Sequence, residues 1–330
     1  MKKIGLTTTV PVEVLLAAGY KPIDLNNIFI TDEDHKKYID IAERDGFPKS
    51  LCAWIKGIYG VCIDKGIKEI VGVTEGDCSN TKGLIEVLGL KGIKVHPFGF
   101  PHSHKMKDLK IQIDDLMDRF NVTIDEVEKV RQEINEVRKL GIEIDRLTYE
   151  DLKVSGFENH LYEVSFSDLW GDINIFREEL KNRIDEYKKR KKFNKVLRIG
   201  YIGVPPMTAD LYDFVEEQDG LIVYNEVQRE FAFPRAHEAK DIYEQYYDYT
   251  YVYDVNFRIK ELKRQIDIRK LDGIIHYTQA FCYRAIEDIV LKEKLDIPIL
   301  NIEGDTSNKL DERTKLRLEA FLDMLKDLKE

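Results

Sequence analysis

The sequence lacks the features that mark membrane proteins, secreted proteins and nucleic-acid-binding proteins. No stretch of the 330 residues approaches the roughly 20 apolar residues of a transmembrane helix, and the amino-terminal segment has no apolar run long enough for a signal peptide. Acidic residues outnumber basic ones by 61 to 51, and the net charge of −10 argues against a nucleic-acid-binding face, which needs a local basic excess. We therefore expect a cytoplasmic protein that contacts neither nucleic acid nor membrane.

Cysteine is scarce, and its spacing does not fit a structural zinc site. The four cysteines are Cys52, Cys62, Cys78 and Cys282, and no two of them form the closely spaced pair that a closed zinc site usually has. Because thiols stay reduced in the cytoplasm, these residues are candidates for metal binding or catalysis before disulfides. Buried, inert thiols are the alternative. A G-x-x-x-x-G-K-[ST] motif is also absent, so we do not expect the chain to use ATP itself.

Six short apolar runs predict β-strands, and amphipathic segments between most of them predict helices. This alternation is typical of a parallel sheet that is covered by helices on both faces. Because the pattern occurs twice, we predict an α/β protein with two doubly wound, Rossmann- or flavodoxin-like lobes. The predicted strands are residues 67–74, 93–97, 197–203, 220–224, 272–277 and 297–302.

The middle of the chain has helical spacing and no strand signal. Thr123 and Glu126 form a capping box, which is typical of a helix start. The predicted helices are residues 109–120, 122–140 and 166–192. The predicted parts of the chain are an amino-terminal lobe at residues 1–104, a helical connector at 105–195 and a carboxy-terminal lobe at 196–330.

Three of the cysteines lie where an α/β fold binds its ligands. Cys78 follows the first predicted strand and Cys282 follows the fifth, while Cys52 opens the helix before the first. Ligands of open α/β sheets bind at the carboxyl ends of the strands, so these thiols could face one cleft between the lobes. Three thiolates from separate elements would suit an iron–sulfur cluster with one open iron, and buried thiols remain the alternative.

Several segments, in order along almost the whole chain, resemble the 2-hydroxyacyl-CoA dehydratase/benzoyl-CoA reductase family, which contains the 2-hydroxyglutaryl-CoA dehydratase subunits. No single motif is specific, but the ordered set is. The matching segments are PVEVLLAAGYKPI at residues 11–23, LCAW at 51–54, GDCSN at 76–80, RIGYIGVP at 198–205, FC at 281–282, IPILNIEGD at 297–305 and TKLRLEAF at 314–321.

The resemblance implies a cofactor and a reaction. It assigns Cys52, Cys78 and Cys282 as ligands of a [4Fe–4S] cluster between the two lobes, and Cys62 falls outside the pattern as a packed helix residue. It implies a hydro-lyase that eliminates water from a 2-hydroxyacyl-CoA through a ketyl radical, with the electron supplied by a separate ATP-dependent activator protein. The family also implies pairing of subunits, either as a homodimer or with a paralogous subunit.

Two other functions stay open. Some homologues carry a double-cubane [8Fe–9S] cluster, and a protein of that class would be a low-potential reductase of a small molecule. The chain could also be a non-catalytic scaffold that carries a cluster.

Glu75 and His276 are the candidate catalytic residues. Glu75 flanks the loop of Cys78 and is a candidate base, and His276 is predicted at a strand end six residues before Cys282. A dense tyrosine run at residues 246–253 is interleaved with acidic residues, so we expect it to serve packing or dimerisation and not nucleobase stacking.

Overall fold

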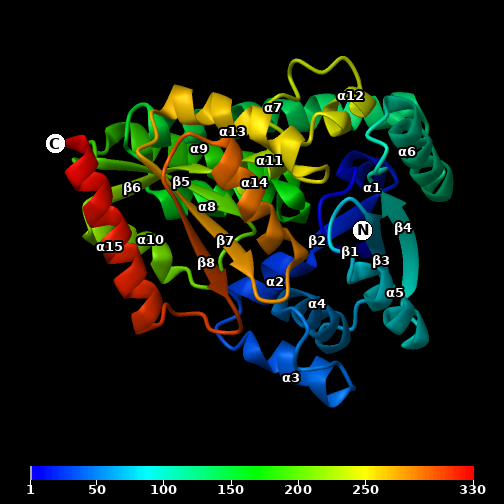
Figure 1. Ribbon diagram of the computed structural model, residues 1–330. Coiled ribbons are helices and arrows are strands. Elements are labelled where there is room, and N and C mark those ends of the chain that lie inside the picture. The colour runs from blue at the N-terminus through cyan, green and yellow to red at the C-terminus, as the bar shows by residue number, and fades with distance from the viewer. Residues whose placement is uncertain (1) are drawn as a thin grey trace. The chain divides into compact units, whose positions relative to one another are not determined.

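Two four-stranded sheets, each wholly parallel, organise residues 2–330, the part of the chain that the computed structural model describes (Figure 1). Helices flank both sheets, and the predicted α/β class is confirmed. The chain divides into two compact units that are not continuous in sequence. Unit 1 contains the chain up to Leu140, Val164–Glu179 and Phe231–Tyr253; unit 2 contains Gly141–Glu163, Leu180–Glu230 and Asp254–Glu330.

The sheet of unit 1 has the strand order β2-β1-β3-β4. Its strands are β1 (Lys2–Leu6), β2 (Tyr20–Asp24), β3 (Glu69–Glu75) and β4 (Lys94–Gly99). Its helices include α1 (Val12–Ala17), α2 (Leu25–Thr31), α3 (Lys36–Arg44), α4 (Ala53–Asp64), α5 (Thr81–Leu90), α6 (Met106–Phe120) and α12 (Ile242–Tyr247).

Two strands of unit 1 confirm predictions and two were missed. The strands β3 and β4 match the predicted runs, whereas β1 and β2 were not predicted. Proline is normally confined to edge strands, because it cannot donate a hydrogen bond to a neighbour. Pro22 lies in β2 at the edge of the sheet, where it pairs with Ile4 of β1. The proline that obscured this strand in the sequence is therefore compatible with its place in the sheet.

The sheet of unit 2 has the order β6-β5-β7-β8, the same arrangement as in unit 1. All four strands match predicted runs, and β5 does so with both its ends. The strands are β5 (Leu197–Gly203), β6 (Gly220–Asn225), β7 (Gly273–Gln279) and β8 (Ile299–Gly304). The helices of this unit include α8 (Gly156–Val164), α10 (Asp210–Glu217), α11 (Glu226–Phe231), α13 (Val255–Arg269), η3 (Tyr283–Ile286), α14 (Glu287–Lys294) and α15 (Glu312–Lys329).

Helices cover both faces of the unit 2 sheet. On one face α10 and α15 bury Leu211 and Leu322 against the strands, and on the other α13 and α14 bury Leu262 and Leu291 (Figure 1). Each fully buried side chain of this kind stabilises the fold by about 1.5–3 kcal/mol. From β5 the chain passes to β6 on one side and returns to β7 on the other, so the carboxyl ends of β5 and β7 form the switch point at which such folds bind ligands.

The helical stretch that lies in sequence between β4 and β5 differs from the prediction in two ways. The capping box is confirmed, because the Thr123 amide donates to Glu126 Oε2 at 2.8 Å, but α7 (Ile124–Tyr149) extends well beyond residue 140. The prediction of one continuous helix over residues 166–192 is wrong at its start. The short helices η1 (Ser165–Ser167) and η2 (Leu169–Gly171) come first, and α9 (Ile173–Lys189) forms the rest of the predicted helix.

The break before α9 has a local cause. Leu169, Trp170 and Gly171 have φ values of 53°, 54° and 65°, which lie outside the right-handed helical region. The Asp168 carboxylate accepts hydrogen bonds from the Trp170 amide at 3.0 Å and the Asp24 amide at 2.9 Å. This carboxylate therefore holds the chain to the end of β2 instead of letting the helix continue.

The tyrosine run belongs to the interior of unit 1. Tyr246 and Tyr249 are buried, and the Tyr246 hydroxyl donates to Glu13 Oε2 at 2.7 Å. Glu13 is itself buried and forms an ion pair with Arg138 at 2.8 Å. Burial acts to raise the pKa of Glu13, but the charge of Arg138 and the hydrogen bonds from Tyr246 and Gln245 outweigh it and lower that pKa. The prediction that the tyrosines serve packing is confirmed.

None of the helices formed by residues 2–330 combines the length and the apolar character needed to cross a bilayer.

Candidate functional site

Cys78 lies in the loop at the carboxyl end of β3. This loop begins at Gly76, where φ is +90° and an added Cβ would lie 2.5 Å from Phe100 Cβ, so that position requires glycine. The carbonyl of Cys78 accepts a hydrogen bond from the Thr81 amide at 3.1 Å as α5 begins. The half-buried Cys78 thiol is thus placed between the end of a strand and the start of a helix.

Cys52 is the N-cap residue of α4, as the sequence predicted. Its backbone is extended and its carbonyl accepts a hydrogen bond from the Lys56 amide at 3.3 Å. The thiol is buried. The amides at a helix start favour negative charge, so the position suits a thiolate.

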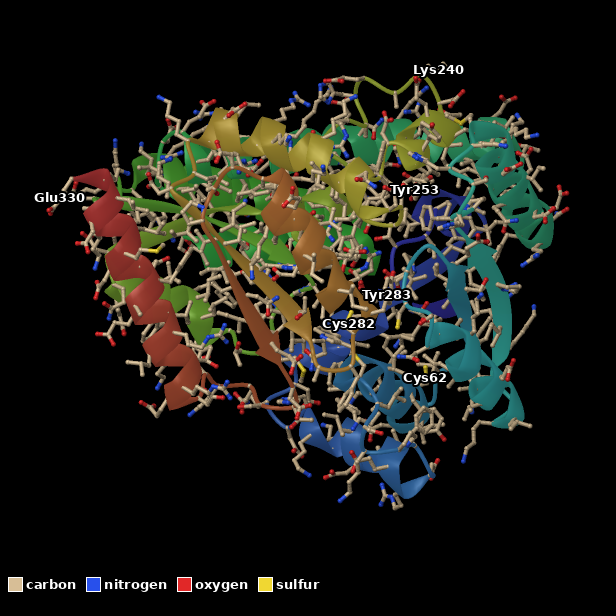
Figure 2. All side chains as sticks on the ribbon, viewed as in Figure 1. Cys62, Lys240, Tyr253, Cys282, Tyr283 and Glu330 are labelled. Carbon is tan, nitrogen blue, oxygen red and sulfur yellow. The ribbon has the colours of Figure 1, made fainter. Side chains whose placement is uncertain are left out.

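Cys282 occupies the corresponding position in unit 2. Its amide donates to the Gln279 carbonyl at 3.0 Å at the end of β7, and the residue caps the start of η3. Figure 2 shows Cys282 beside Tyr283 in this turn. Because β3 and β7 hold the same place in their sheets, Cys78 and Cys282 follow equivalent strands at the two switch points.

Cys62 differs from the other three thiols. It lies inside α4, 1% exposed, and burial raises the pKa of its thiol to about 12. A thiol with such a pKa is not a thiolate near neutral pH, and only the thiolate binds metals well. The prediction that Cys62 is a packed helix residue is confirmed.

The two candidate catalytic residues have different surroundings. Glu75 ends β3 with its side chain exposed, and its Oε1 accepts a hydrogen bond from the His102 amide at 2.7 Å. His276 is 1% exposed, and its Nδ1 lies 3.0 Å from Asp288 Oδ1. Because β7 continues to Gln279, His276 lies within the strand and not at its end.

Two buried polar atoms near these loops have no hydrogen-bond partner within the described part of the chain. They are the indole Nε1 of Trp54, two residues after Cys52, and the hydroxyl of Thr208, in the loop after β5. Buried polar atoms are normally paired, so each of these two atoms has room for a water molecule, an ion or a bound group as its partner. Neither atom was predicted, because the sequence does not show which polar atoms are buried without a partner.

The predicted cluster ligands are divided between the units, with Cys52 and Cys78 in unit 1 and Cys282 in unit 2. Across residues 2–330, no three His, Cys, Asp or Glu side chains are grouped so that they could hold a metal ion. The shared use of these cysteines in one cluster therefore stays a prediction. The donor chemistry fits such a cluster, because Cys52, Cys78 and Cys282 supply the thiols that iron–sulfur clusters bind, and all three lie in turns or at caps outside the regular helices and strands.

Comparison with known families decides the wider assignment. The family model described as 2-hydroxyglutaryl-CoA dehydratase, D-component, matches residues 7–325, nearly the whole chain. The chain belongs to this D-component family. No curated protein matches the chain.

The D-component match spans Cys52, Cys78 and Cys282, together with every strand of the unit 2 sheet and the strands β2, β3 and β4 of unit 1. The family name describes a dehydratase, so membership supports a dehydratase-type enzyme subunit. A D-component is one part of a system, and membership therefore also indicates, in general terms, a partner activator.

Proposed function

We propose that the chain is the cluster-carrying subunit of a 2-hydroxyacyl-CoA dehydratase, a hydro-lyase that eliminates water from its thioester substrate. The observation that carries the proposal is the D-component match over residues 7–325. The places of the three thiols support it: Cys52 is the N-cap residue of α4, where backbone amides favour a thiolate, and Cys78 and Cys282 follow the equivalent strands β3 and β7. An ATP-dependent activator, a homodimer partner or paralogous subunit, and an acyl-CoA substrate complete the proposal.

The three thiolates would hold a [4Fe–4S] cluster. When bound, such a cluster supplies a low-potential electron and an iron that can act as a Lewis acid toward the thioester substrate. The chain's own task is to hold the cluster through the loops after β3 and β7 and to move the proton that leaves with the hydroxyl group.

Glu75 and His276 are proposed for that proton transfer. Elimination removes the 2-hydroxyl group and one proton from C3, so the site needs a base. Glu75 is exposed, and its hydrogen bond to the His102 amide fixes the direction of its carboxylate. His276 is held by Asp288, which fixes its ring in the way that an orienting carboxylate fixes a catalytic histidine.

The first test is iron and acid-labile sulfide per chain in anaerobically purified protein, with EPR after reduction by dithionite. We expect about four irons per chain and a cubane-type signal. Cys52→Ala, Cys78→Ala and Cys282→Ala should each lose iron, and Cys62→Ala is the matched control that should keep it. A markedly larger iron content with an unusual spectrum would favour the double-cubane reductase. Protein that stays colourless after anaerobic reconstitution would refute the cluster.

A further inference from the structure

A chain of buried ionic side chains runs through unit 2 from the end of β5 to the turn of Cys282. Glu226 is the first residue of α11, and its Oε2 accepts a hydrogen bond from the Gly203 amide at 3.0 Å. Arg258 of α13 donates to both oxygens of Glu226, at 2.9 and 2.8 Å. The same guanidinium binds Glu287 through Nη1, and Glu287 accepts from Arg284 at 3.0 Å.

These groups are charged and removed from water. The Arg258 side chain is fully buried, and those of Glu226 and Arg284 are almost so. Burial acts to raise the pKa of Glu226, but the charge and hydrogen bonds of Arg258 outweigh it and lower that pKa. Removing one member of such a chain leaves its partner buried without a counter-charge, which proteins tolerate poorly.

The first link of this chain sits on a fixed backbone. Gly203 has a φ of +95°, and an added Cβ would lie 2.1 Å from the Tyr277 carbonyl oxygen of β7. A side chain therefore does not fit at this position, and β7 packs directly against the Gly203 backbone. Glu226 is therefore anchored at the carboxyl end of β5, beside the switch point of the sheet.

The last link is the turn that carries Cys282. Arg284 lies two residues after Cys282 and is the buried residue of η3. Its neighbours Phe281, Tyr283 and Ile286 are 60%, 46% and 71% exposed, so apolar burial contributes little to holding the turn. Phe281 also has a φ of 65°, which is unfavourable for a non-glycine residue. The turn depends on its polar contacts.

We propose that Arg258 is a positioning residue for Cys282. It bridges the two carboxylates of Glu226 and Glu287 and so ties the turn of Cys282 to the ends of β5 and β6. The benefit of this role to the cluster rests on the proposed function. The placement of the Cys282 thiol can be tested separately, in protein without iron.

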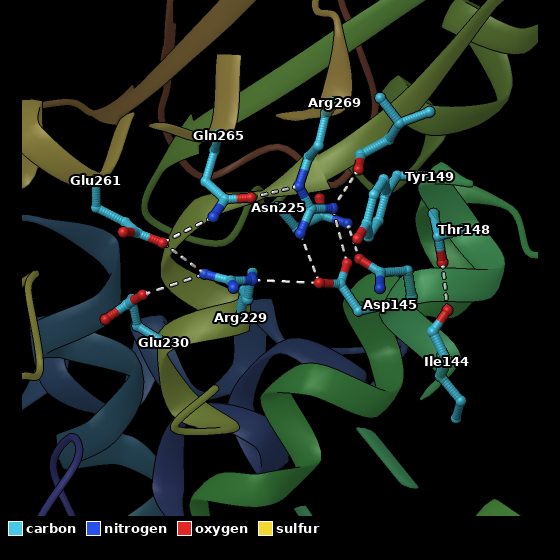
Figure 3. Close-up of polar contacts among 12 residues, drawn as sticks. Ile144, Asp145, Thr148, Tyr149, Asn225, Arg229, Glu230, Glu261, Gln265 and Arg269 are labelled. Atoms are coloured by element: carbon cyan, nitrogen blue, oxygen red, sulfur yellow. Dashed lines mark hydrogen bonds and ion pairs between the residues drawn. The ribbon is translucent and has the colours of Figure 1, made fainter. Parts of the chain in front are cut away.

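The structure offers a matched control on the same helix. Arg269 is also on α13 and also buried, and it pairs with Asp145 at 2.7 Å and with Gln265 at 2.7 Å (Figure 3). It is the last residue of α13, at the end opposite Arg258, and its guanidinium donates to Asp145, Gln265 and the Val223 carbonyl, none of which lies in η3 or α14. Arg258→Lys and Arg269→Lys thus remove the same planar guanidinium from equally buried sites. Only Arg258→Lys changes the ionic contacts that lead to the turn of Cys282.

The decisive measurement is the alkylation rate of each cysteine in iron-free, full-length protein, read by peptide mass spectrometry. We expect Arg258→Lys to speed alkylation of Cys282 about three- to tenfold by loosening the turn, and to leave Cys78 unchanged. Arg269→Lys should leave both rates unchanged. In reconstituted protein, the EPR signal and midpoint potential should shift in Arg258→Lys and not in Arg269→Lys.

A second variant keeps the test decisive if Arg258→Lys fails to fold. Glu287→Gln retains the volume and one acceptor but removes the charge that joins Arg258 to Arg284. Glu287→Gln should also speed alkylation of Cys282. The Cys282 alkylation rate of Glu287→Asp, which keeps the charge, should lie between those of the wild type and Glu287→Gln. Unchanged Cys282 alkylation in folded Arg258→Lys or Glu287→Gln would overturn the positioning role. Wild-type protein that binds no iron would refute the proposed function while leaving the alkylation result intact.

Discussion

At the scale of single residues, position relative to the helices separates the thiols of this chain into two kinds. Cys62 lies inside α4, where burial raises the pKa of its thiol to about 12. The other three cysteines stand just before helices, where backbone amides favour an anion. The distinction could be predicted, because helical spacing placed Cys62 within an amphipathic run and the other three next to turns.

Asp168 provides a prediction about pH. Burial, followed by the charge of Asp24, raises the pKa of Asp168 from its ordinary value of 3.8 to about 7. Between these values the folded state binds more protons than the unfolded state, so stability falls as the pH rises through this window. Asp168→Asn does not titrate, and it keeps one oxygen acceptor in place of the two that now accept from the Trp170 and Asp24 amides.

We expect Asp168→Asn to gain stability relative to the wild type between about pH 5 and about pH 8. Urea denaturation of both proteins at the two pH values measures this difference. Parallel pH profiles for the two proteins would show that Asp168 does not titrate in this range.

At the scale of elements, Gly203 fixes the junction of β5 and β7. Its φ is +95°, and an added Cβ would lie 2.1 Å from the Tyr277 carbonyl oxygen, so there is no room for a side chain. Gly203→Ala should therefore lower the free energy of unfolding by about 2–4 kcal/mol, since the backbone itself must shift.

Gly83 is the control for this change. It lies in α5 with ordinary φ and open space around the position of a Cβ. Gly83→Ala should raise the free energy of unfolding by about 0.5–1 kcal/mol through higher helix propensity. Equal effects of the two substitutions in thermal or urea unfolding would contradict the account of the β5–β7 junction.

The elements that sequence reasoning missed share a physical cause. Of the six predicted strands, β3, β5, β6 and β7 have apolar runs that are buried on both faces, as is typical of parallel strands. The edge strands β4 and β8 are only partly buried, and shorter apolar runs predicted them. Strand β2 escaped because Pro22 is acceptable only at a sheet edge, and edge position is not visible in the sequence. The break at residues 169–171 depends on Asp168 meeting the Asp24 amide 144 positions away. Likewise, the ionic contacts of Arg258 connect side chains from α11, α13, α14 and η3, and the spacing of these residues in the sequence does not predict that they meet.

At the scale of the whole molecule, the proposed ligands link parts of the chain that are far apart in sequence. Cys52 and Cys78 belong to unit 1 and Cys282 to unit 2. A group that binds only the folded chain stabilises it, so removal of iron should lower the melting temperature by about 5 °C or more. Differential scanning calorimetry of loaded and iron-free protein measures the shift. Cys282→Ala should abolish it and Cys62→Ala should preserve it; an equal melting temperature in loaded and iron-free protein would argue against ligands from both units.

The return of Phe231–Tyr253 to unit 1 has a consequence for synthesis. Glu13 and Tyr246 are hydrogen-bonded although 233 residues separate them, and Gln245 donates to the same carboxylate. A nascent chain therefore carries Glu13 for about two-thirds of translation, and Arg138 for about one third, before Tyr246 is made. The four strands of the unit 1 sheet end at Gly99, but distant contacts form late, so unit 1 cannot be completed until Phe231–Tyr253 has been made. Unit 1 therefore stays incomplete, and accessible to chaperones and proteases, until about three-quarters of the polypeptide has been made.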